Sequence, residues 1–172
     1  MKVKQILFKV IPFVSIAVLV LAFGFIFIPH SFVMFRENFA QYSFSGFEVF
    51  FLANQYFTDN ISTATVSAAG IITISFLVLA VVANVFANKA SFLKLIAGIL
   101  TSVTGFMFMA MQLWMLFKYA SYTPVALWIP YINGTFLLAC GGLTIWGAVD
   151  LLVKEKNAPF TANKSYSYLK KK

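Results

Sequence analysis

Four stretches of the chain run for about twenty residues or more with almost no charged side chain. Three of them contain no Asp, Glu, Lys or Arg, and the fourth contains only Asp150. They cover residues 10–28, 64–87, 95–117 and 125–152. Because a helix needs about 20 apolar residues to cross the hydrocarbon core of a bilayer, each stretch can form one span. We therefore predict an all-α integral membrane protein, a four-helix transmembrane bundle that occupies residues 1–153.

The composition of the 172 residues points the same way. Hydrophobic residues make up 61% of the chain and charged residues only 10%, whereas a soluble domain has roughly 25% charged residues. A chain with so few charges cannot cover a globule with polar surface, so we expect much of its exterior to face lipid.

The formal net charge of +8 raises the question of a nucleic-acid partner. The lysines sit at the two ends of the chain and in one short link, and they do not form a basic face on a folded module. Lysines that flank spans set the orientation of a membrane protein and contact anionic headgroups. We expect the lipid bilayer, and no nucleic acid, to be their partner.

The lysines also predict the orientation of the chain. Opposite the lysine-rich side there are only Arg36 and Lys118. The positive-inside rule then places both termini in the cytoplasm. The many Phe, Ile, Lys and Asn residues indicate an AT-rich coding genome, which is typical of a bacterial source. An aromatic belt is expected at the outer interface: Trp114, Tyr119, Tyr122, Trp128 and Tyr131.

The segment between the first two spans, residues 29–63, is long and rich in aromatic residues, and we expect it to be a structured outer loop that contains a short helix, strands or both. Its aromatic residues recur at spacings of three and four, which predicts a short amphipathic helix on the membrane surface. They are Phe32, Phe35, Phe39 and Tyr42. The run Phe47–Leu52 fits either a short strand or a second interfacial helix. After residue 153 the sequence becomes polar and basic, so residues 154–172 are predicted to be a flexible cytoplasmic tail.

Small residues recur on two of the predicted spans and indicate where helices approach each other. Gly98, Ser102 and Gly105 lie on one face of the third span, and Gly142 lies on the fourth. Small side chains let membrane helices pack closely. Their spacing leaves open whether these faces meet within one chain or between chains.

Two amides, Gln112 and Asn133, fall inside predicted spans, where a polar group has to find a partner. We expect them to hydrogen-bond across a helix pair, and as an alternative they could line a path for a small solute. Asp150 lies four residues before Lys154, which suits a local ion pair.

Nothing in the sequence indicates a metal, a cofactor or a reaction. His30 is the sole histidine and Cys140 the sole cysteine. A methionine stripe on the third span is more typical of packing than of copper binding. The sequence lacks a Walker A loop, H-E-x-x-H, C-x-x-C and G-x-S-x-G. We therefore expect a protein that is not an enzyme and holds no metal or cofactor.

The order of parts resembles the claudin-like four-span layout, with one span, a long aromatic outer loop and three closely linked spans. The W-GLW-C-C pattern that marks claudins is absent, because residues 29–63 contain neither Trp nor Cys. The segment Tyr42–Phe51 resembles that of small four-span bacterial membrane proteins that carry a Tyr/Phe-Ser-Gly-aromatic run before the second span. The resemblance implies an architecture and no particular activity.

These features favour a structural or interaction subunit of an assembly in the cell membrane, which binds another membrane protein or a second copy of itself. The expected contact residues are Phe44, Gly46, Phe47 and Glu48 of the outer loop. A channel or transporter component for a small solute is the alternative. A membrane enzyme or a lipid-binding protein, with Glu48 or Asp59 acting at headgroup level, is a third reading.

Overall fold

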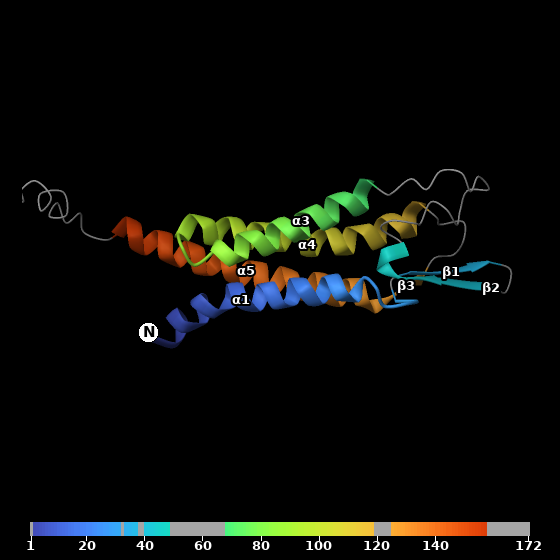
Figure 1. The fold of residues 1–172 in the computed structure, drawn as a ribbon, viewed down its shortest axis with the longest axis horizontal. Helices are drawn as coiled ribbons and strands as arrows, with labels where there is room; N and C mark the ends of the chain where they lie inside the picture. Colours follow the sequence, from blue (N-terminus) through green and yellow to red (C-terminus); the bar gives the residue numbers. More distant parts are fainter. Residues whose placement is uncertain (1, 32, 38–39, 49–67, 119–124, 158–172) are drawn as a thin grey trace, which may run out of the picture.

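The computed structural model describes residues 2–31, 33–37, 40–48, 68–118 and 125–157. Most of these residues belong to long helices that run side by side along one axis (Figure 1). They are α1 (Lys2–Phe25), α3 (Ala68–Phe86), α4 (Ser91–Lys118) and α5 (Trp128–Asn157). The molecule is therefore mostly helical, as the apolar runs predict.

Three of these helices, α1, α4 and α5, are long and apolar enough to cross a membrane. The apolar part of α3 is shorter and covers Gly70–Phe86. Residues 64–67 of the expected second span lie outside the described residues, as do residues 49–63 of the loop and 158–172 of the tail. Within the described residues, the architecture is that of a helical bundle compatible with an integral membrane protein.

The helix ends differ from the predicted ones in ways that charge and proline explain. α1 begins at Lys2 and α4 at Ser91, so both helices include lysines that hydropathy alone excludes from a span. Pro130 lies in the first turn of α5, where backbone N–H groups have no partner within the helix, so the N–H that proline lacks is not needed there. α5 continues to Asn157, past the predicted end of the bundle at residue 153. The positive charges of the lysines in its last turn stabilise this end of the helix, because they lie at the negative end of the helix dipole.

A small antiparallel sheet lies at one end of the bundle (Figure 1). β1 (Val33–Glu37) is its central strand, between β2 (Ala40–Phe44) and the two-residue β3 (Val125–Ala126). The prediction of an amphipathic helix here is wrong. Phe35 and Tyr42, which would share one helix face, are directly opposite partners on β1 and β2. Aromatic residues seven apart can satisfy either pattern, and cross-strand pairing decides in favour of the hairpin.

Each long helix packs mainly against two others. α1 packs against α3 and α5, and α4 packs against the same two helices. The most extensive of these interfaces joins α4 to α5. We call the end that carries the sheet the sheet end, and the opposite end, where the described lysines of α1, of the α3–α4 link and of α5 gather, the lysine-rich end (Figure 1).

The core lies along the bundle axis and reaches into the sheet end. It combines buried side chains from every long helix with one side chain from β2. Its larger members are Leu19, Ile26, Phe44, Leu77, Phe108 and Leu137. Because Phe44 belongs to this cluster, the end of β2 is anchored in the same packing that holds the helices together.

Candidate functional site

The α4–α5 interface is held at close range by glycines from both helices. A Cβ placed on Gly98 would lie 2.9 Å from the carbonyl oxygen of Gly141, and one on Gly141 would lie 2.8 Å from the oxygen of Gly98. Gly105 and Gly134 form a second pair of the same kind, with 2.8 Å in both directions. A side chain at any of these four positions would meet main-chain atoms of the facing helix, so glycine is what lets α4 and α5 approach this closely.

The structure places three of the four predicted packing residues in this interface. Gly98 and Gly105 face α5 directly, and Ser102 lies against Gly141. Gly142 does not belong to the interface: it is exposed, and a Cβ there would meet nothing within 4 Å among the described residues. The interface residue is its neighbour Gly141, because adjacent helical residues point about 100° apart. The seven-residue spacing shared by the pairs 98–105 and 134–141 is the signal that identifies it.

A buried polar link joins α3 to α4. The Asn84 side chain is 1% exposed, and its Nδ2 donates to the Ala80 carbonyl and to Thr101 Oγ1, both at 2.8 Å. The Thr101 hydroxyl donates in turn to the Ala97 carbonyl at 2.8 Å. Asn84 thus links α3 to α4 by a buried side-chain hydrogen bond.

We predict that this link can be measured by a double-mutant cycle with Asn84→Leu and Thr101→Val. Interhelical hydrogen bonds in bundles of this kind contribute about 0.6–1.7 kcal/mol. The two substitutions should therefore couple by that amount in the free energy of unfolding in detergent. A coupling free energy of zero would show that the two side chains do not interact in solution.

The two amides predicted to lie inside spans, Gln112 and Asn133, are both buried toward the sheet end. Gln112 Nε2 donates to the Leu127 carbonyl at 2.9 Å, which ties α4 to the residue before α5. Asn133 is 4% exposed, and its Nδ2 finds no partner among the described residues. The cavity beside Asn133 measures only about 60 Å³ and has apolar walls, including Phe25 and Ile129.

The predicted contact residues of the outer loop serve chiefly to attach it to the bundle. Ser45 and Glu48 form a capping box, in which Glu48 Oε2 accepts from the Ser45 backbone N–H at 2.6 Å and Glu48 N donates to Ser45 Oγ at 3.2 Å. Phe44 is 6% exposed and Gly46 is buried. Only Phe47 presents an exposed side chain, 38% accessible. The Ser-x-x-Glu spacing is the sequence signal for this cap.

Further contacts fix the loop to the end of α1. The backbone N–H of Phe47 donates to the Ile26 carbonyl at 2.8 Å, and the rings of Phe27 and Phe47 stack with centroids 5.5 Å apart. His30, with φ of 55°, turns the chain, and its Nδ1 lies 2.6 Å from Ser43 Oγ on β2. The sheet is therefore held in a fixed position relative to the helices.

At the lysine-rich end, α1, the α3–α4 link, α4 and α5 surround a cavity of about 730 Å³. We call it the lysine cavity. It is lined by Gln5, Phe8, Lys9, Phe13, Asn88, Lys94, Asp150, Leu151 and Lys154. Three lysines and one aspartate give its wall a formal charge of +2.

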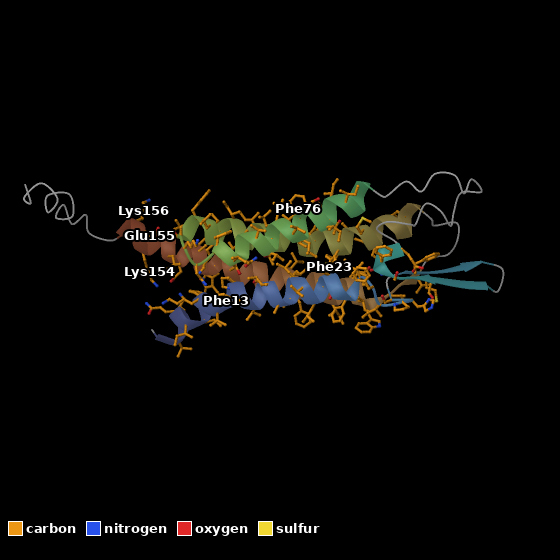
Figure 2. The ribbon with its side chains drawn as sticks, viewed as in Figure 1. Phe13, Phe23, Phe76, Lys154, Glu155 and Lys156 are labelled. Atoms are coloured by element: carbon orange, nitrogen blue, oxygen red, sulfur yellow. The ribbon has the colours of Figure 1, made fainter. Side chains whose placement is uncertain are left out.

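Asp150 is shared by lysines from two helices. The predicted ion pair with Lys154 is present at 2.6 Å, and Lys4 of α1 reaches the other carboxylate oxygen at 2.9 Å. The carboxylate is thus surrounded by two ammonium groups, and the pair with Lys4 links the first helix to the last. In Figure 2, Lys154 lies with Lys156 at the end of α5, away from the sheet.

Lys94 is the most deeply buried charged residue of this cavity, with 3% of its surface exposed. Its Nζ donates to the Phe8 carbonyl at 2.7 Å. In a regular helix that carbonyl would accept from residue 12, but Pro12 lies inside α1 and has no N–H. Lys94 therefore supplies the donor that Pro12 lacks. Asn88 Nδ2 donates in the same way to the adjacent Lys9 carbonyl at 3.0 Å.

Among the described residues, no three His, Cys, Asp or Glu side chains come together as a metal site would require. The methionine stripe is partly in the core, where Met111 is 3% exposed.

Comparison with protein-family models and with curated proteins gives no match for this chain. Its function therefore has to be inferred from the geometry of the described residues.

Proposed function

We propose that this protein is a non-enzymatic subunit of a membrane assembly, which uses the sheet outside its helices to bind a second membrane protein or a second copy of itself. The observation that carries the proposal is the free edge of β2. In the sheet order β2-β1-β3, no other described strand pairs with the outer side of β2. Such an edge offers a row of backbone donors and acceptors to an extended segment of a partner.

The attachment of the sheet to the helical bundle supports this role. A binding element is effective when it is rigid before binding, because less conformational entropy is then lost on association. β1 pairs with β3, which directly precedes α5, and Phe44 of β2 lies in the bundle core. The sheet is thus joined to the start of α5 through β3 and to the bundle core through Phe44, and these two attachments hold it in place.

In this proposal, all four long helices cross the membrane, and the lysine-rich end lies in the cytoplasm. The 19 residues of α3 extend about 28 Å at 1.5 Å per residue, close to the thickness of a hydrocarbon core of about 30 Å. The gathering of lysines from three separate segments at one end is the arrangement that the positive-inside rule favours. The sheet then faces the outside of the cell membrane.

The small-residue faces, which the sequence left open as contacts within one chain or between chains, give no support to this proposal. The glycines at 98, 105, 134 and 141 lie in the interface between α4 and α5 of the same chain. A channel or transporter component has less support still. Of the two amides, Asn133 borders a cavity of only about 60 Å³ with apolar walls, too small to admit a solute path.

The proposal predicts that the full-length protein, extracted in a mild detergent, runs in native mass spectrometry as a stoichiometric complex with a partner or a second copy. Gln41→Lys on β2 should dissociate that complex, because a lysine on an edge strand opposes strand addition. Position 41 lies in the middle of β2, the edge strand, in register with Arg36 of β1. The helical content should stay unchanged.

Gln5→Lys is the matched control, since it makes the same change of charge on an exposed position of α1 at the opposite end. It should leave the complex intact. A wild-type protein that is strictly monomeric and carries no partner would overturn the proposal. Equal dissociation by both variants would show that net charge, and not the edge of β2, governs assembly.

A further inference from the structure

The lysine cavity contains more positive charge than the described residues neutralise. Asp150 is the acidic residue of its wall, and that carboxylate is already shared by Lys154 and Lys4. Lys9 and Lys94 have no carboxylate within 4 Å among the described residues. Glu155, at the same end, accepts from the Ser91 hydroxyl instead.

The unbalanced positive charge matters most at Lys94, because its side chain is buried. An ammonium group has three donors, and one of them is used on the neutral Phe8 carbonyl. A buried charge is stable only when an opposite charge or several hydrogen bonds compensate for it. A cavity wall of this kind is completed by an anion with several acceptor oxygens, and a phosphate group has that chemistry.

The remaining lining residues indicate what carries the phosphate. Gln5 to Phe13 span about 12 Å along α1, from polar residues at the end of the bundle to an apolar ring. Phe13, labelled on α1 in Figure 2, is 62% exposed, and Leu151 is half-buried, so the lining of the cavity reaches the apolar outer surface of the helices. A charged end next to an apolar wall matches a phospholipid headgroup joined to its acyl chains.

We infer that the lysine cavity binds the phosphate headgroup of an anionic phospholipid, with Lys9 and Lys94 facing the phosphate and Phe13 facing an acyl chain. Basic pockets between membrane helices on the cytoplasmic side recognise lipid headgroups in this way. The site lies at the opposite end of the bundle from the sheet, so the inference goes beyond the proposed interaction and does not depend on it.

Native mass spectrometry of the full-length protein in nonionic detergent tests the inference. We titrate phosphatidylglycerol and phosphatidylcholine, which both carry a phosphate but differ in net charge. One phosphatidylglycerol should bind more tightly than any phosphatidylcholine. Lys9→Gln should weaken its binding about five-fold, the effect of about one lysine at a membrane surface, and Lys9→Gln with Lys94→Gln should weaken it further.

Lys89→Gln is the matched control, because Lys89 lies at the same end but does not line the cavity, and its Nζ sits over the Phe86 ring at 4.6 Å. It should leave the affinity within about two-fold of the wild type. If the Lys94 variant does not fold, Lys9→Gln carries the test alone, since its side chain is exposed. Equal affinity for both lipids, or equal loss in the Lys89 variant, would overturn the inference.

A soluble phosphate ester is the other source of the same chemistry, and sn-glycerol 3-phosphate serves as its probe. The apolar part of the cavity predicts that this compound competes with phosphatidylglycerol only at a far higher concentration. If glycerol phosphate binds as tightly as the lipid and loses affinity in the same variants, the lipid assignment is wrong.

Discussion

Gly141→Ala is expected to destabilise the bundle by about 2 kcal/mol, although it adds a single methyl group. That methyl would lie 2.8 Å from the Gly98 carbonyl oxygen and 2.7 Å from the backbone nitrogen of Ser102. Both are main-chain atoms of α4, so the clash is relieved only when the helices separate. Overpacking of this kind costs about 1–3 kcal/mol, more than the intrinsic gain of replacing glycine in a helix.

Gly142→Ala provides a control one residue away. A methyl group there meets nothing within 4 Å, so the only effect is the gain in helix propensity, up to about 1 kcal/mol. The free energy of unfolding, measured by titration of detergent-solubilised protein with sodium dodecyl sulfate, should thus change in opposite directions for the two variants. If both variants behave alike, α4 and α5 do not approach as closely as the structure has them.

Phe108→Ala is expected to lower the free energy of unfolding by about 2–3 kcal/mol. Phe108 is fully buried and belongs to the central cluster with Leu19, Leu77 and Leu137. Truncating a buried Phe to Ala in a soluble protein costs about 3–5 kcal/mol, through the loss of transfer free energy and through the cavity that remains. In a membrane protein the unfolded spans stay in an apolar medium, so we expect the cavity contribution to dominate and the total to be smaller.

Phe106→Ala, two residues away on the same helix, separates packing from hydrophobicity. Phe106 is 61% exposed on the outside of the bundle, where detergent or lipid replaces its contacts. Its truncation should change the free energy of unfolding by less than about 0.5 kcal/mol, measured by the same titration. A large effect at both positions would mean that Phe106 has a partner in the folded protein.

The edge of β2 that no other described strand covers and the lysine cavity could not have been read from the sequence, for different reasons. The helical spacing of the outer aromatic residues also fits a hairpin, and local pattern does not decide between the two. Strand β3 has only two residues and pairs with β1 from more than eighty positions away. Such a pairing depends on where the helix ends bring the chain, and its own residues carry no signal for it.

The role of Lys94 illustrates the same limit within one contact. The sequence marks Pro12 as a residue that leaves a helical carbonyl without its donor, and it marks Lys94 as a charge beside a span. Only the packing of α1 against the rest of the bundle brings the Lys94 ammonium to the Phe8 carbonyl. Eighty-six positions separate the two residues, so neither feature alone predicts the other.

The apolar runs and the placement of lysines by themselves determined that the chain forms long helices, and that the described lysines of α1, of the α3–α4 link and of α5 lie at one end of the bundle. Both properties depend on local composition, because a helix of about twenty apolar residues satisfies its own backbone hydrogen bonds. The small residues showed that helices approach closely, but not which ones. The tertiary structure decided that Gly98 and Gly105 meet Gly141 and Gly134 within the same chain. Close contact depends on which helix faces are turned toward each other, and this is a property of the tertiary structure. Adjacent helical residues point about 100° apart, so Gly141 lies in the interface and Gly142 lies outside it.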